Sequence, residues 1–243
     1  MNVGNGGETG MYDEEEAQSA EGMLRITAVK QDRRAKQRYH IYISDHEEPF
    51  TSVHEDLLIK FRLFKDREIH PDELKQITEE DSRHRAYVLG LSYLGARPRT
   101  HKELLQYLAR KGMDEETSEH AIARLKKEKL VDDTSYANRF AVERMSNQLK
   151  GRRLLRQELQ MHGIDKSTAK QASDDLDKET EIEAAVRAAN KKWPYIKGEP
   201  RERRHKLAGF LLRRGFPSDV VKHAINTVSQ GMEDDEEGHM LDN

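Results

Sequence analysis

The feature that most limits how this chain can fold is an internal repeat between residues 84 and 228. Its pattern is leucine, three residues, leucine, three residues, glycine and then an apolar residue. The glycines lie 51 and then 52 residues apart, at Gly112, Gly163 and Gly215. The other members are Leu104, Leu108 and Met113, then Leu155, Leu159 and Ile164, then Leu207, Leu211 and Phe216. A period of this length predicts stacked supersecondary units in place of one large core.

Four further columns keep the same register. Nine residues after each glycine stands an alanine, and four residues later an aliphatic side chain; upstream, two more columns repeat. The four columns are Ala121, Ala172 and Ala224; Leu125, Leu176 and Val228; Ala86, Ala137 and Ala188; and Leu91, Val142 and Trp193. We expect three helices in each unit. The first ends near the Leu91 column, the second is closed by glycine, and the third carries the alanine column after it.

Local signals explain the breaks between these helices. A glycine just past a helix can adopt the left-handed C′ conformation, and the apolar residue after it can pack back on the last turn. Thr100 and Glu103 fit a capping box before the second helix of the first unit. Asp114 and Asp165 are suited to cap two of the third helices. Each unit should therefore resemble a helix-turn-helix.

The start of the chain has a different pattern. Residues 24–30 and 38–44 alternate apolar and polar positions, which predicts a β-hairpin, and residues 49–53 offer a short third strand. Helical spacing begins at Glu55, and Pro71 suits the start of another helix. The predicted fold class is mainly α: three tandem three-helix (helix-turn-helix-like) repeats in an elongated array, with a small N-terminal β-hairpin segment.

Charge separates the ends of the chain from its body. Each end holds six of the 45 acidic residues and no Lys or Arg, so residues 23–228 carry +9 although the whole chain carries −3. We expect these ends either to aid solubility or to shield the basic body transiently. The predicted segments are an acidic disordered tail (1–22), a β-rich segment leading into helix (23–64), a connecting helix (65–83), repeats at 84–132, 133–182 and 183–228, and an acidic disordered tail (229–243).

Several classes of chemistry have no support in the sequence. The chain has no cysteine, which excludes disulfides and thiolate metal sites. It has no phosphate-binding loop and no zinc-protease or serine-hydrolase motif. Its 11 histidines are scattered, and no pair shows metal spacing backed by carboxylates. We therefore expect no enzyme, cofactor or metal site. Its apolar runs are too short to span a bilayer, so we expect a cytoplasmic protein away from membranes. Its three units are unequal and no heptad for dimerisation is present, so we expect a monomer.

Basic clusters recur on the second helices and on one third helix. Arginine forks bind phosphates and carboxylates, so a ridge of them suits a phosphate backbone or an acidic protein groove, while a solvated face is the alternative. The third helices begin acidic or mixed, which disfavours reading of DNA bases. The basic residues singled out for contact with DNA or with an acidic protein partner are Arg110, Lys111, Lys126, Lys127, Arg152, Arg153, Arg156, Arg213 and Arg214.

The stretch at 132–144 stands between the first two units. Asp132 or Asp133 can cap a helix on which Tyr136, Phe140 and Arg144 recur every four residues. Either these are core anchors with a packed charge, or they form a functional face. Together with RKGMDEE, GRRLLRQELQMHGI and LRRGFPSDVVKHAI, the run LVDDTSYANRF resembles the RecX family of regulators of the RecA recombinase. The resemblance covers about 84–228, and the β-rich opening looks like that of the longer members.

The resemblance implies a function as well as a fold. RecX-family proteins lodge in the groove of the RecA filament on single-stranded DNA, have no known catalytic site, and restrain filament growth, ATP hydrolysis and strand exchange in recombination, DNA repair and the SOS response. A weak direct DNA contact is left open. The acidic run at 173–185 departs from a continuous basic ridge. The alternative is a helix-turn-helix transcription regulator. The family-motif positions are Asp132, Asp133, Tyr136, Ala137, Phe140 and Arg144.

Overall fold

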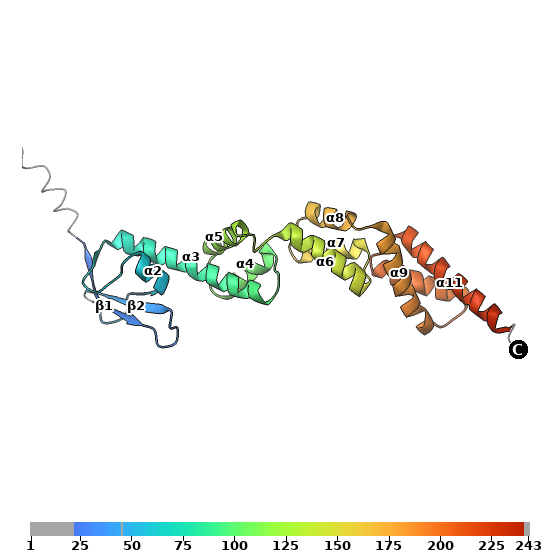
Figure 1. The fold of residues 1–243 in the computed structure, drawn as a ribbon, viewed down its shortest axis with the longest axis horizontal. Helices are drawn as coiled ribbons and strands as arrows, with labels where there is room; N and C mark the ends of the chain where they lie inside the picture. Colours follow the sequence, from blue (N-terminus) through green and yellow to red (C-terminus); the bar gives the residue numbers. More distant parts are fainter. Residues whose placement is uncertain (1–21, 45, 241–243) are drawn as a thin grey trace, which may run out of the picture. The chain divides into compact units, whose positions relative to one another are not determined.

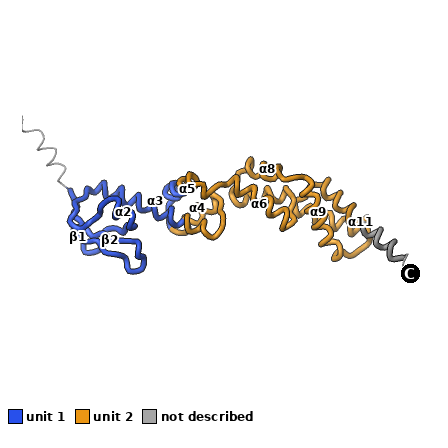
Figure 2. The backbone as a smooth tube through the Cα atoms, in the orientation of Figure 1, with its two compact units in different colours: residues 1–89, 112–121 blue, residues 90–111, 122–243 orange. Residues whose placement is uncertain are grey.

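The structure, a computed structural model, describes residues 22–44 and 46–240, with side chains up to residue 230. The chain divides into two compact units (Figure 2). The first comprises residues 1–89 and 112–121, and the second comprises residues 90–111 and 122–243. The described part is mostly helical with a small N-terminal sheet, which confirms the predicted fold class, while the elongated arrangement stays a prediction.

The N-terminal sheet has four strands in the order β3-β2-β1-β4, and all neighbours are antiparallel. The predicted hairpin and third strand are confirmed, with Val29 opposite Ile41. The short β4 was not predicted, because two residues are too few to show a period of two. Isoleucines of β1 and β2 form a core with Leu74 and Ile77 of the following helix. The strands are β1 (Leu24–Gln31), β2 (Arg38–Ile43), β3 (Thr51–His54) and β4 (Glu68–Ile69).

Two helices accompany the sheet: α2 (Glu55–Lys60) and the long α3 (Pro71–Ala96). The sequence predicted a connecting helix at 65–83 and a new unit from residue 84. The structure joins the two into one helix without a break from Pro71 to Ala96. This helix begins later than predicted, because residues 68–69 belong to strand β4.

The three repeats then follow in order (Figure 1). The first repeat uses the end of α3 together with α4 (His101–Arg110) and α5 (Glu115–Lys127). The second has α6 (Asp133–Gln148), α7 (Arg152–Met161) and α8 (Lys166–Asp174), and the third has α9 (Lys178–Lys192), the 3-10 turn η1 (Trp193–Tyr195), α10 (Pro200–Arg213) and α11 (Ser218–Met240). No helix in the described residues is long and apolar enough to cross a membrane.

The predicted helix breaks are confirmed. Gly112, Gly163 and Gly215 have φ angles of 79°, 89° and 87°, as left-handed C′ residues require. After two of these glycines, the N–H of the apolar residue donates to the carbonyl five residues back, the pattern of a Schellman motif. The capping box of Thr100 with Glu103 is formed, and Asp114 and Asp165 accept hydrogen bonds from their helices' first N–H groups.

Two details correct the expected repeat. The first helices of the first two repeats do not end at the Leu91 column, because α3 and α6 run several residues past it, whereas α9 ends beside Trp193 as predicted. As a result Leu91 and Val142 are exposed while Trp193 is buried, so this column is not a uniform core position.

The last helix also runs further than expected. We predicted a disordered tail from residue 229, but α11 continues to Met240. Val220, Val221, Ala224 and Val228 anchor its buried side, and Gln, Met and Glu beyond them are good helix formers. Residues 1–21 and 241–243, where the predicted tails begin and end, lie outside the described residues.

Two equivalent contacts join the first repeat to the second and the second repeat to the third, and both lie within the second unit. The glycine turn that closes the second helix of one repeat packs against the start of the second helix of the repeat before it. A Cβ atom on Gly163 would lie 2.3 Å from the Cβ of Lys102, and one on Gly215 would lie 2.3 Å from the backbone nitrogen of Leu154. The backbone N–H of Gly151 donates to the Arg214 carbonyl at 2.8 Å. The repeats therefore have the same fold, and the same type of contact joins each repeat to the next.

Candidate functional site

A cleft of about 380 Å³ lies where the first repeat meets the second. The loop after α3 supplies one wall, α6 supplies the floor, and the end of α7 closes it. Its lining residues are Arg97, Pro98, Tyr136, Arg139, Phe140, Glu143, Arg144 and His162. Three of the six family-motif residues predicted from the sequence, Tyr136, Phe140 and Arg144, therefore meet in one cleft.

Local sequence explains how α6 presents these side chains. The Asp132 side chain accepts a hydrogen bond from the Ser135 N–H and starts the helix, so residues four apart lie on one side. Asp132 thus serves as the cap, whereas Asp133 accepts a hydrogen bond from the His101 N–H at 3.0 Å. Ala137 is fully buried in the core of the second repeat, beside α8. These three motif residues fix the helix that carries the other three.

The floor of the cleft is an aromatic cluster. The rings of Tyr136 and Phe140 stack with centroids 5.9 Å apart, and the His162 ring meets Phe140 edge-on at 5.2 Å. The guanidinium of Arg144 lies 4.8 Å above the Phe140 ring, a cation–π contact. Phe140 is buried, which agrees with the interpretation of this residue as a core anchor. Tyr136 and Arg144 are half-buried at the edge of the Phe140 ring.

His162 connects the cleft to the first repeat. Its Nδ1 lies 3.2 Å from a carboxylate oxygen of Glu103, and its carbonyl accepts a hydrogen bond from the Thr100 hydroxyl at 2.7 Å. Arg97 lies 3.9 Å from the same carboxylate. The position of the His162 ring is thus set by the capping box of α4.

The cleft has a positive balance. Three guanidinium groups line it against the single carboxylate of Glu143, and Glu103 behind it is engaged by His162 and Arg97. Burial raises the pKa of the Tyr136 phenol above its usual value, and the Glu103 carboxylate adds to the rise. The phenol therefore keeps its proton at neutral pH and can donate a hydrogen bond. Such a surface can bind carboxylates or other anions beside an apolar face.

Six of the nine basic residues singled out from the sequence are exposed. They are Arg110, Lys111, Lys126, Lys127, Arg153 and Arg213. The structure does not gather them into the cleft, which none of them lines.

The other three basic residues, Arg152, Arg156 and Arg214, make hydrogen bonds within the chain. The Nε of Arg152 donates to a carboxylate oxygen of Glu181 at 2.5 Å, and Arg156 donates to Ser173 and Asp174. Arg214 donates to the carbonyls of Gln148 and Leu149, at 2.6 and 3.0 Å. These arginines are committed to contacts within the second and third repeats.

Sequence reasoning missed five residues that line the cleft: Arg97, Pro98, Arg139, Glu143 and His162. Two of them carried a signal, because Arg139 and Glu143 lie three and seven residues after Tyr136, on the same side of α6. Arg97, Pro98 and His162 carried none, since packing between two repeats brings them there.

Comparison with known proteins agrees with this architecture. Models of the first, second and third three-helix domains of RecX match residues 86–125, 132–172 and 179–225. The chain is 30% identical to the regulatory protein RecX of Oceanobacillus iheyensis over 223 residues, which cover 90% of this chain and 82% of the relative. The corresponding protein of Clostridioides difficile is 30% identical over 202 residues, covering 83% and 94%.

Solved structures give the same result. A crystal structure of regulatory protein RecX superposes with a TM-score of 0.67 at 29% identity, covering 82% of this chain and 97% of that one. RecX from Lactobacillus salivarius superposes with a TM-score of 0.58 at 26% identity, covering 62% and 99%. The matching domains, the relatives and the shared fold together confirm the resemblance read from the sequence, and the chain belongs to the RecX family of regulatory proteins.

Proposed function

We propose that this chain binds the RecA filament on single-stranded DNA and restrains its growth, its ATP hydrolysis and its strand exchange. It would act as a negative regulator of recombination, DNA repair and the SOS response. Membership of a family whose relatives are named regulatory protein RecX supports a regulatory role. The action on RecA follows from the family resemblance together with the surface described above.

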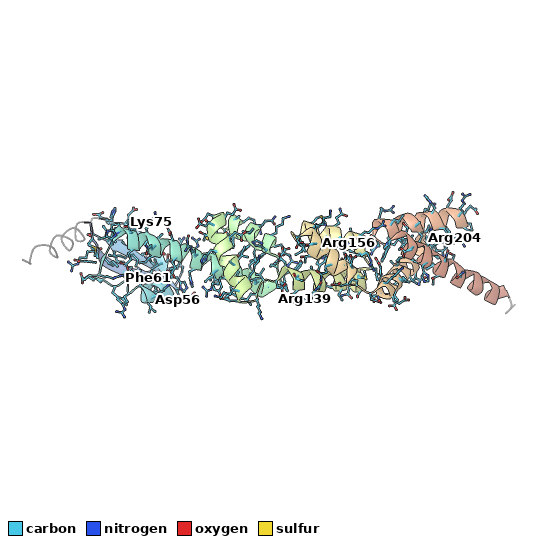
Figure 3. All side chains as sticks on the ribbon, turned by 90° about the horizontal axis from the view of Figure 1, so that it is seen from above. Asp56, Phe61, Lys75, Arg139, Arg156 and Arg204 are labelled. Carbon is cyan, nitrogen blue, oxygen red and sulfur yellow. The ribbon has the colours of Figure 1, made fainter. Side chains whose placement is uncertain are left out.

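The observation that carries the proposal is the cleft between the first and second repeats. Its exposed or half-buried arginines surround aromatic rings, a combination suited to a protein segment that offers a carboxylate next to an apolar side chain. Arg139 extends from α6 to the surface (Figure 3). A bare phosphate backbone would not use the apolar part of this cleft. We therefore assign the cleft to RecA and not to DNA.

The exposed basic residues make a second contact in this proposal. Arg153 and Arg213 lie on the second helices of successive repeats, and Lys126 and Lys127 end a third helix. Exposed cationic side chains attract a polyanion at long range, so they would speed encounter with a filament that contains DNA. Arg152, Arg156 and Arg214 are left out of this contact because their side chains are engaged within the chain.

The regulation would work by binding alone. A series of helices that occupies a filament groove can block subunit addition without any chemical step, so we assign no catalytic residue and no cofactor.

A competition binding experiment tests the proposal. The fluorescently labelled full chain is mixed with RecA filaments on single-stranded DNA, and bare single strands or duplex DNA are added as competitors. We expect the chain to stay on the filament. Equal or tighter binding to duplex DNA would instead support the helix-turn-helix transcription regulator.

A further inference from the structure

Two histidines and an aspartate of the first unit converge, although the sequence separates them by up to 30 residues. His54 caps the start of α2, Asp56 lies in its first turn, and His84 comes from α3. A carboxylate oxygen of Asp56 lies 3.4 Å from His54 Nδ1 and 3.8 Å from His84 Nε2. The two imidazole rings have centroids 4.5 Å apart. This cluster differs from the expectation that no histidine pair is backed by a carboxylate.

The distances are close to those of a metal centre. Zinc bonds to nitrogen and oxygen of about 2.0–2.1 Å at tetrahedral angles place neighbouring ligand atoms about 3.3 Å apart. Both separations from Asp56 are near that value, and the three ligand atoms all lie within 4.8 Å of one another. To surround one ion, His54 would release the long hydrogen bond that its Nδ1 accepts from the Asp56 N–H, and the three side chains would rotate toward one another. Two imidazoles, a carboxylate and one water make a four-coordinate set.

The surroundings hold the cluster in place. The backbone N–H of His54 donates to one oxygen of the buried Asp81 at 2.8 Å, and Arg38 donates to the other at 2.6 Å. Asp81 therefore fixes His54 but does not offer a fourth ligand. The side chains of His54 and His84 are 14% and 19% exposed, whereas that of Asp56 is 67% exposed. An ion would enter from the solvent at the Asp56 side.

A helix cap is the simpler explanation for part of this cluster. His54 Nδ1 accepts a long hydrogen bond of 3.3 Å from the Asp56 N–H. The start of α3 has the same arrangement, where His70 Nδ1 accepts from the Asp72 N–H at 3.2 Å and lies 3.4 Å from the Asp72 carboxylate. Among the described residues, however, only the His54 group gains a second imidazole and becomes a three-ligand cluster. Capping does not account for that second ring.

We propose that His54, Asp56 and His84 bind one divalent transition metal ion of the zinc class. Imidazole and carboxylate ligands together suit Zn²⁺, Co²⁺ and Ni²⁺. The ion would link the start of α2 to the middle of α3 and so stabilise this part of the first unit. This site is independent of the proposed RecA contact, since its residues lie in a different unit from the cleft.

Zinc titration of the tag-free, metal-stripped full chain tests the site. His70→Gln is the matched control, because His70 caps α3 as His54 caps α2 but has no second imidazole beside it in the described part of the chain. We expect the wild type and His70→Gln to take up one Zn²⁺ and to gain thermal stability from it. His84→Gln and Asp56→Asn should each lower the affinity for Zn²⁺ at least about tenfold. Removal of even the outer-shell partners of a metal site causes a loss of this size.

Asp56→Asn keeps the experiment decisive if His84→Gln does not fold, because the Asp56 side chain is mostly exposed and its loss should leave the far-UV circular dichroism unchanged. The absence of stoichiometric Zn²⁺ uptake by the wild type would overturn the proposal. Wild-type affinity in Asp56→Asn would overturn it as well, and so would an equal loss in His70→Gln.

Discussion

The Thr100 hydroxyl donates a hydrogen bond of 2.7 Å to the carbonyl oxygen of His162, across the junction of the first two repeats. The same hydroxyl accepts from the Glu103 N–H and so caps α4. Its partner His162 is the residue before Gly163, and at the next junction Arg214, the residue before Gly215, accepts from Gly151. Helix capping, helix termination and contact between repeats thus depend on the same few residues, which constrains the spacings of 51 and 52 residues between the glycines.

The glycine turns should differ in their tolerance of a methyl group. All three have positive φ, but a Cβ on Gly112 would meet no atom within 4 Å, whereas one on Gly163 would overlap Lys102. We expect Gly112→Ala to cost about 1 kcal/mol from backbone strain alone. Gly163→Ala should cost about 2–3 kcal/mol, because overpacking is added to the strain. Urea unfolding of both variants measures the difference, and equal losses would contradict the junction.

The ion pair between Arg152 and Glu181 should be a major stabilising contact of the second and third repeats. The Glu181 side chain is 1% exposed, so Arg152→Ala leaves a buried carboxylate without its cation. Removing one partner of such a pair costs about 3 kcal/mol. The adjacent, exposed Arg153→Ala is the matched control and should stay within about 0.5 kcal/mol of wild type. Chemical denaturation distinguishes the two, and a stable Arg152→Ala would show that the pair contributes little.

Stability should depend on pH through the cap of α8. Asp165 accepts hydrogen bonds from Ser167 and Thr168, and these lower the pKa of its carboxyl well below the usual 3.8. The charged form is thus favoured in the folded state, so this stabilisation is present above about pH 4 and is lost as pH falls below it. Asp165→Ala should therefore be less stable than wild type at pH 7, with the gap closing toward pH 2. A gap that is constant from pH 7 to pH 2 would contradict this account.

Charge reversal in the cleft should separate binding from folding. Arg139 is exposed, and its Nε donates a long hydrogen bond of 3.4 Å to the Ser135 carbonyl. Hydrogen bonds from Ser135 lower the pKa of the Asp132 carboxyl, and the positive charge of Arg139 helps to lower it further. Arg139→Glu should weaken binding to the RecA filament roughly tenfold, about 1.4 kcal/mol, with only a small fall in the thermal midpoint. Arg187→Glu, at an exposed position of α9 outside the cleft, is the matched control. Filament titrations decide the point, and equal effects of the two reversals would remove the cleft from the interface.

Much of the fold could be predicted because local signals and the repeat agree. A glycine that needs positive φ and an aspartate that caps a helix act within a few residues, so Gly163 and Asp165 could be assigned from the sequence. The continuity of α3 could not, since a helix of 26 residues shows no break where the repeat begins. The period marks where units recur, and it does not mark where helices start.

The candidate site was less accessible to sequence reasoning. Charge alone gave Arg152 and Arg153 the same weight, although one pairs with a buried glutamate 29 residues away and the other is exposed. The cleft needs His162 from one repeat and Arg97 from another, a contact that only packing creates. The His54 cluster is of the same kind, because its residues come from the junction of β3 with α2 and from α3.

The most direct test of the central claim is ATP hydrolysis by RecA on single-stranded DNA in the presence of this chain. We predict that hydrolysis falls at well below one chain per RecA, since a chain of three linked repeats can block addition of further subunits to a growing filament. The Arg139→Glu variant should need more protein for the same effect. Unchanged hydrolysis at equimolar wild-type protein would contradict the proposal that this chain restrains RecA.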